Sequence, residues 1–217
     1  DVNNDATRVE VNTISAEMAK VRDYVPDYAV MAHRGSTFWA PEETESAWRW
    51  AREMGADYLE SDLQCTKDGV ILANHDDNLK RTTNIENVYS ELVPATRKAF
   101  YMRHGMSEEE AEKLVAADKA SFRPYYAMSY MYEELLALDA GSWFNETSIE
   151  QARKSFAEKH QYVSALEDQI RYAEGKMLKR GSDGERIYTV TGTWDPDKPR
   201  DCLTYKFEYV DDPQDTG

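Results

Sequence analysis

Residues 28–75 read YAVMAHRGSTFWAPEETESAWRWAREMGADYLESDLQCTKDGVILANH, and this stretch decides the fold. The apolar run 28–32 ends at His33-Arg34-Gly35, which is typical of a buried strand that leaves into a loop. A helix is predicted over 44–54, because Ala47, Ala51 and Met54 share one face and Gly55 follows the last turn.

Two further strands are predicted in the same stretch, over 57–63 and 70–73, joined by the turn 67–69. The order strand, helix, strand, strand is the opening of an α/β fold, and we expect these strands to pair in parallel.

Helical and extended patterns alternate over the rest of the chain. Helices are predicted from the capping box at Ser107, over 132–138, and from a second capping box at Ser148, after which the helical period continues through Tyr162 to about Lys179. The period then changes to two over 187–191 and 203–209, which predicts a hairpin with a long loop. Three of its residues are tyrosines that could form a substrate lid or a contact surface, or could pack the hairpin onto its neighbouring helices: Tyr188, Tyr205 and Tyr209. General burial trends favour packing.

Composition excludes some classes of partner. The 217 residues carry a net charge of −15, and such a field repels phosphate backbones, so nucleic acid is not an expected partner. The longest apolar runs are only a few residues, so no transmembrane segment is predicted. The two cysteines, Cys65 and Cys202, allow at most one disulfide and do not define a redox compartment.

Glu60 and Asp62 form the first candidate site. They lie two residues apart on a predicted strand, so both side chains leave the same face. Two such carboxylates repel one another unless a cation lies between them, and hard ions such as Mg²⁺ or Ca²⁺ prefer oxygen ligands. An isolated pair of this kind is more often a solvated strand edge, so the interpretation depends on the neighbouring residues.

Two histidines supply that context. His33 follows the first predicted strand and His75 follows the third, and strand ends of this kind converge on one rim of a parallel α/β fold. Two imidazoles that flank a phosphoryl group can act as general base and general acid, and Arg34 offers a planar fork for phosphate oxygens. We interpret the remaining histidines, His104 and His160, as structural.

The chain resembles the glycerophosphodiester phosphodiesterases. The segments that carry the resemblance occur in the order and spacing of that family: 33–35, 41–44, 55–62, 66–69, 75–77, 81–84 and 138–143. Glu43 departs from the family pattern, which usually has Asn at this position.

The resemblance implies a (β/α)₈ barrel and metal-dependent hydrolysis of a small-molecule glycerophosphodiester to glycerol 3-phosphate and an alcohol. Glu60 and Asp62 would then ligate a divalent metal, Mg²⁺ or Ca²⁺, and His33 and His75 would be the catalytic acid/base pair. Arg34 and Glu42 would bind substrate.

The length predicts an incomplete barrel. We interpret 1–27 as a leader or edge segment, 28–144 as the N-terminal part of the barrel with an insertion at 85–128, and 145–217 as a helical and hairpin insertion. Roughly 100 residues then remain for barrel and leader, against about 200 or more for a complete barrel. We therefore expect a longer protein, a third metal ligand beyond Gly217, and weak metal binding and little activity in this chain.

Two other functions remain open at this point. One is a non-catalytic binding module that retains the motif, and the other is a phospholipid-cleaving phosphodiesterase of related fold, which the acidic charge disfavours. The polar start without Met favours export to the periplasm or cell surface, with a cytoplasmic location as the alternative. The alcohol group of the substrate and the oligomeric state are left open by the sequence.

Overall fold

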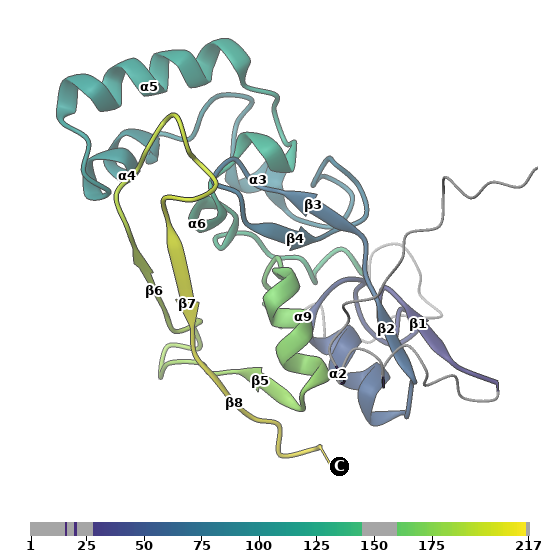
Figure 1. The fold of residues 1–217 in the computed structure, drawn as a ribbon. Coiled ribbons are helices and arrows are strands. Elements are labelled where there is room, and N and C mark those ends of the chain that lie inside the picture. Colours follow the sequence, from purple (N-terminus) through teal and green to yellow (C-terminus); the bar gives the residue numbers. More distant parts are fainter. Residues whose placement is uncertain (1–15, 17–19, 21–27, 145–159, 216–217) are drawn as a thin grey trace, which may run out of the picture.

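The computed structural model describes residues 28–144 and 160–215, together with the single positions 16 and 20. Apart from those two positions, the expected leader 1–27 lies outside the described residues, and so does the helix expected to begin at Ser148. Within the described ranges, the strands form four two-stranded sheets, with helices between them (Figure 1).

The first unit is a parallel β–α–β segment. Strand β1 (Met31–His33) pairs with β2 (Tyr58–Glu60), and the register places His33 opposite Glu60. Helix α2 (Glu45–Glu53) joins them and begins where the Thr44 side chain accepts a hydrogen bond from the backbone N–H of Ala47. The predicted helix and the parallel pairing of the two strands are confirmed. The burial predicted for the first strand is wrong: β1 lies in a two-stranded sheet, and Val30 and Met31 are exposed.

The next two strands pair differently from the prediction. The strand predicted over 57–63 breaks after Glu60, and β3 (Leu63–Cys65) pairs antiparallel with β4 (Ile71–Ala73). The expectation that 70–73 pairs in parallel is therefore wrong, because the connection 66–70 is far shorter than the dozen or so residues that a parallel crossover needs. The hairpin returns the chain to the end of β2, where the Asn74 N–H donates to the Asp62 carbonyl at 2.9 Å.

A group of short helices follows β4. They are α3 (Ile85–Val88), α4 (Arg97–Arg103), α5 (Glu108–Ser121), the 3₁₀ turn η2 (Ala127–Ser129) and α6 (Tyr132–Leu135). The capping box predicted at the start of α5 is confirmed, since the Ser107 side chain accepts from the Glu110 N–H and the Glu110 carboxylate accepts from the Ser107 N–H. Helix α6 is shorter than the helix predicted over 132–138.

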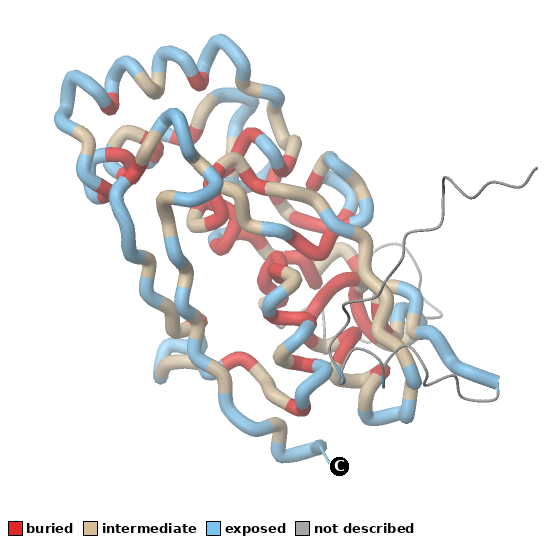
Figure 2. Tube along the Cα trace, viewed as in Figure 1, coloured by how far each residue is buried: buried red, intermediate tan, exposed pale blue. Residues whose placement is uncertain are grey.

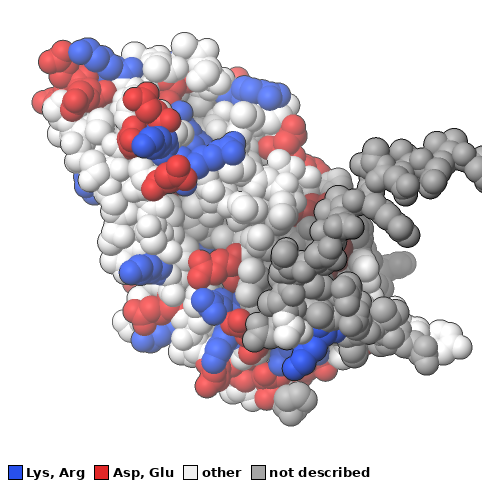
Figure 3. Space-filling view, viewed as in Figure 1, with Lys and Arg blue, Asp and Glu red and all other residues white. Residues whose placement is uncertain are grey.

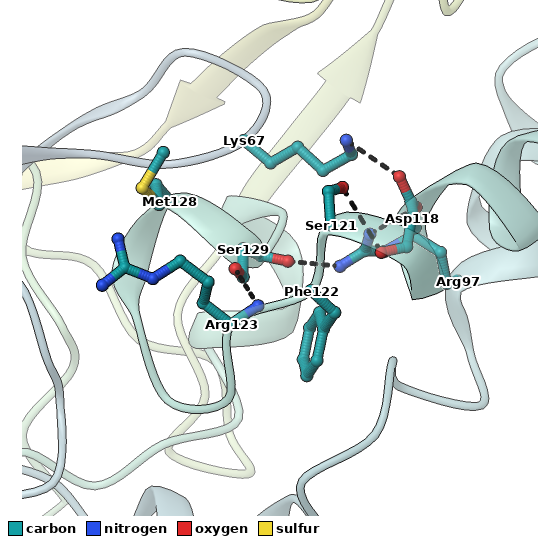
Figure 4. A pocket seen from close by; sticks show the side chains of 8 residues that line it. All are labelled: Lys67, Arg97, Asp118, Ser121, Phe122, Arg123, Met128 and Ser129. Carbon is teal, nitrogen blue, oxygen red and sulfur yellow. Dashed lines mark hydrogen bonds and ion pairs between the residues drawn. The ribbon is translucent and has the colours of Figure 1, made fainter.

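A buried arginine joins these helices to one another. Arg97 donates to Asp118 at 2.6 Å, to Glu134 at 2.8 Å and to the Ser129 carbonyl at 2.9 Å. Figure 4 shows this cluster beside a cavity of about 210 Å³, with Lys67 from the β3–β4 turn reaching Asp118 at 2.9 Å. The cluster fixes α4, α5 and α6 against the β3–β4 turn.

The helical period predicted to continue through Tyr162 to about Lys179 is present only in part. Residues 162–165 are extended, and the Ser164 carbonyl accepts from the Ala73 N–H. Helix α9 (Leu166–Ala173) begins only where the Asp168 carboxylate accepts from the Ala165 N–H, and β5 (Lys176–Leu178) follows it. Between them Gly175 has φ +77°, a left-handed conformation that ends the helix.

The predicted hairpin near the end of the described chain is confirmed. Strand β6 (Tyr188–Thr191) pairs antiparallel with β7 (Thr204–Phe207). The run predicted over 203–209 divides at Glu208, whose N–H donates to the Ile187 carbonyl, and β8 (Tyr209–Asp211) pairs with β5 instead.

Among the described residues, three apolar clusters are buried, and two of them are large. Figure 2 shows the larger one as buried chain along the middle of the molecule, where α2, β4, α6 and α9 meet. Tyr188, Tyr205 and Tyr209 pack against this cluster, so the packing interpretation of the three tyrosines is confirmed. The second cluster joins α4 and α5 to Trp194 in the β6–β7 loop.

Acidic and basic side chains lie close together on the face drawn in Figure 3. On α5, for example, Lys113 pairs with Glu109, and Lys98 of α4 reaches Glu108 and Glu112. No helix among the described residues is both long and apolar enough to cross a bilayer.

Candidate active site at the ends of β1, β2 and β4

The centre of the site is a group of three potential metal ligands. Because His33 and Glu60 are register partners, their side chains meet at the end of the parallel pair, and His33 Nε2 lies 4.0 Å from Glu60 Oε2. Asp62 joins them after β2, and one ligand atom from each of the three residues lies within 4.8 Å of the others. An imidazole and two carboxylates at this spacing fit a divalent cation.

Arg34 covers the acid pair. Its backbone N–H donates to Glu60 Oε2 at 3.1 Å, its Nε forms an ion pair with Asp62 Oδ2 at 3.0 Å, and its Nη1 donates to Glu42 Oε1 at 3.4 Å. The guanidinium therefore lies next to any phosphate that approaches the two carboxylates.

A second group of charges links this centre to His75. Arg81 donates to both oxygens of Glu42, at 2.7 and 3.0 Å, and to both oxygens of Asp76, at 2.8 and 3.1 Å. Asp76 Oδ1 in turn lies 2.5 Å from His75 Nδ1. The side-chain hydrogen bond of Arg81, with a smaller one from His75, lowers the pKa of Asp76 to about 2.

Glu43 is a buried acid directly behind the metal-ligand group. Its carboxylate accepts from the Ser61 hydroxyl at 2.7 Å and from the Asp62 N–H at 2.9 Å. Removal from water raises the pKa of Glu43 to about 7, and the neighbouring charges of Asp62 and Glu60 act in the same direction. Glu43 thus holds the chain segment that carries Asp62.

All six predicted site residues lie in one continuous polar network. It runs from His33 through Glu60, Asp62, Arg34 and Glu42 to Arg81, Asp76 and His75. The histidines interpreted as structural lie in other surroundings: His104 contacts the Phe100 ring, and His160 contacts the Tyr162 ring.

Sequence reasoning missed three members of the site: Glu43, Asp76 and Arg81. Each lies inside a segment that carried the family resemblance, 41–44, 75–77 or 81–84, so position in a motif was the available signal. Their roles depend on burial and on contacts between distant segments, such as Arg81 with Glu42.

A family model described as the glycerophosphoryl diester phosphodiesterase family matches residues 33–192. A glycerophosphodiester phosphodiesterase of Bacillus subtilis is 31% identical over 126 residues, which are 58% of this chain and 30% of that protein. The glycerophosphoinositol inositolphosphodiesterase GDPD2 of Mus musculus is 28% identical over 165 residues, 73% of this chain and 25% of that protein. The chain thus spans less than a third of the length of these relatives.

Two solved structures are similar to part of this chain. A glycerophosphodiester phosphodiesterase from Agrobacterium tumefaciens is 27% identical, with a TM-score of 0.41 over 68% of this chain and 43% of that one. A phosphodiesterase of Oleispira antarctica, solved with its product sn-glycerol-3-phosphate, is 23% identical, with a TM-score of 0.42 over 67% of this chain and 40% of that one.

The family model covers 160 of the 217 residues, from His33 through all the other site residues to the end of β6. The expected α/β barrel class agrees with this match and with the parallel β1–α2–β2 unit. The chain belongs to the glycerophosphoryl diester phosphodiesterase family.

Proposed function

We propose that the protein bearing this chain hydrolyses a glycerophosphodiester to glycerol 3-phosphate and an alcohol. Family membership supports the reaction class, and the product seen in the Oleispira enzyme supports the nature of the product. One observation carries the proposal: the polar network joins both histidines, the acid pair and Arg34 at the ends of β1, β2 and β4.

A divalent cation is part of the proposal. Glu60 and Asp62 would hold it, since their oxygens are the ligand type that Mg²⁺ and Ca²⁺ prefer, and the His33 ring lies beside them within the same 4.8 Å. When bound, the cation would polarise the phosphoryl oxygen and offset the developing negative charge. Arg34 would donate hydrogen bonds to the phosphate oxygens. Its contacts with Asp62 and Glu42 place the guanidinium beside the proposed cation site, and its planar fork matches the geometry of a phosphate.

The two histidines would move the protons. The substrate's own glycerol hydroxyl attacks phosphorus and passes its proton to one imidazole, while the bond from phosphorus to the leaving alcohol breaks. The other imidazole gives a proton to the leaving oxygen. Water then opens the cyclic phosphate, and the same pair carries the protons in the reverse sense.

The cation site is tested by calorimetric titration of the chain with Ca²⁺ and with Mg²⁺. We expect heat of binding that disappears in a Glu60→Ala, Asp62→Ala variant, because the two principal oxygen donors are gone. A matched control is Glu109→Ala, Glu112→Ala on α5, which removes two exposed carboxylates paired only with lysines. Binding that survives in the site variant, or that is lost in the control, would contradict the assignment.

The acid/base pair is tested by turnover of a simple glycerophosphodiester, with release of glycerol 3-phosphate as the readout. His33→Ala and His75→Ala should each lower kcat by about 100-fold or more, the usual contribution of a positioned proton donor or acceptor. Cation binding should remain largely intact in both variants. His160→Ala serves as the control and should keep its activity, and turnover that persists without His33 or His75 would refute the pair.

A further inference from the structure

Asp76 and Arg81 have no part in the reaction described above, yet both touch the same histidine-bearing end of β4. Asp76 Oδ1 lies 2.5 Å from His75 Nδ1, and Arg81 Nε lies 2.8 Å from Asp76 Oδ2. The backbone here is also fixed, because the Gln64 side chain donates to the His75 carbonyl at 3.2 Å and the Asn74 side chain donates to the Asp76 carbonyl.

The short contact determines which nitrogen of His75 carries the proton. Asp76 is ionised at neutral pH, since its pKa is lowered to about 2, and an ionised carboxylate only accepts hydrogen bonds. Nδ1 of His75 must therefore be the donor. In the neutral ring this leaves a lone pair on Nε2, the nitrogen that points away from Asp76.

Arg81 restricts where the Asp76 carboxylate can lie. Its guanidinium is bidentate to Asp76 on one side and to Glu42 on the other. A planar fork of this kind sets the orientation of both carboxylates, which a lysine ammonium cannot do. Glu42 also contacts Arg34, so Arg81 links the orientation of His75 to the phosphate-binding side of the site.

We propose that Asp76 and Arg81 are positioning residues for His75: Asp76 holds the ring in the Nδ1–H tautomer with Nε2 free for proton transfer, and Arg81 fixes Asp76 against Glu42. The assignment of proton transfer to Nε2 rests on the proposed function. The tautomer and the contacts that set it belong to the folded chain and do not depend on turnover.

The first test is nuclear magnetic resonance of the ring nitrogens in ¹⁵N-histidine-labelled chain, with the His75 signals assigned by their loss in His75→Asn. We expect protonated Nδ1 and unprotonated Nε2 in neutral His75, the reverse of the tautomer that a free histidine prefers. A protonated Nε2 in the wild-type chain would overturn the proposal without any further variant.

Variants then separate the two positioning residues. Asp76→Ala should return His75 to the ordinary tautomer, Arg81→Met should give a mixture, and Arg81→Lys should lie between Arg81→Met and the wild type. Lys80→Met is the matched control, since Lys80 pairs with Glu86 and lies outside the network. An unchanged tautomer in folded Asp76→Ala would refute the role of Asp76, and an unchanged tautomer in folded Arg81→Met would refute that of Arg81.

Kinetics add a readout that a purely structural role would not change. Asp76→Ala should lower kcat about 10- to 100-fold with little change in KM, as happens when the hydrogen-bond partner of a functional histidine is removed. If the whole protein that bears this chain shows no turnover, the proposed function fails, and the ring-nitrogen measurement still decides the tautomer.

Discussion

Arg34 and Glu43 hold left-handed backbone conformations although neither is glycine, with φ of +59° and +58°. Residues with side chains rarely adopt these angles, and where they do the surrounding structure must compensate the cost. Here the compensation is visible in hydrogen bonds: the Arg34 N–H donates to Glu60, and the Glu43 N–H donates to the Arg34 carbonyl. The strained pair folds the loop after β1 back onto the end of β2.

Glu43 also makes stability depend on pH. Between about pH 4.5 and 7 the native state keeps the proton on Glu43 while the unfolded chain releases it, so the native state binds more protons. The free energy of unfolding should therefore fall as pH rises through this window, by about 3 kcal/mol for a shift of this size. Glu43→Gln removes the titration, and its amide can still accept from the Asp62 N–H and donate to the Ser61 hydroxyl.

Urea unfolding of both proteins from pH 5 to 8, with chelator present, measures the effect as the difference between the two curves. Most of the decrease in the free energy of unfolding that the wild type shows with rising pH should be absent in Glu43→Gln. Parallel curves would show that Glu43 does not titrate in this range.

Among the elements, the β3–β4 hairpin connects the site to the rest of the molecule. Its turn carries Asp68, a buried carboxylate that accepts from the Thr66 hydroxyl at 2.6 Å, from the Tyr132 N–H at 3.0 Å and from the Tyr205 hydroxyl. One turn residue thus anchors α6 and β7. The hairpin leads outward from Asp62 and back to His75, and Asp68 holds its turn against the helices and the second hairpin.

Removing one of these bonds gives a test at the level of the element. Tyr205→Phe keeps the ring packed against Tyr132 and Phe207 and deletes the hydroxyl, so we expect a loss of about 1–2 kcal/mol in the free energy of unfolding. Tyr126→Phe is the matched control, because its ring stays in contact with the Arg123 guanidinium, and its cost should be below about 0.5 kcal/mol. Equal stabilities of Tyr205→Phe and the wild type would mean that the Asp68 bond to β7 contributes nothing.

Across the whole molecule, a second buried charge network joins segments that are far apart in sequence. Asp168 on α9 is fully buried and accepts from the Arg186 guanidinium, from the Tyr209 hydroxyl and from the Ala165 N–H. Arg186 also donates to the Tyr132 hydroxyl at 2.9 Å and covers the Phe207 ring. The helix α9, the strand β8 and the segment before β6 are therefore tied together at one carboxylate.

Asp168→Ala should destabilise the chain by about 3–5 kcal/mol, because it leaves Arg186 buried without its counter-charge. An exposed pair gives the comparison: Glu174→Ala removes a partner of Arg171 on the same helix and should cost less than about 1 kcal/mol. Thermal and urea unfolding of both variants measure the difference. A loss of similar size in the two would show that the Asp168 network does not hold these segments together.

The opening β–α–β unit could be predicted from local sequence, and so could the six candidate site residues that lie in one polar network. This was possible because these features are local: helix caps, two-residue alternation and short ordered motifs depend on near neighbours. For the same reason the capping box at Ser107 and the β6–β7 hairpin were predictable. The helical period predicted through Tyr162 fails before Leu166, because Ser164 and Ala165 pair with β4.

Three features could not be predicted from the sequence. They are the antiparallel pairing of β4, the burial of Glu43, and the linkage of His75 to Arg34 through Asp76, Arg81 and Glu42. Each of these depends on contacts between segments that are distant in sequence, as Glu42 and Arg81 are. The desolvation that raises the pKa of Glu43 and the hydrogen bonds that lower that of Asp76 exist only once the chain has folded around them.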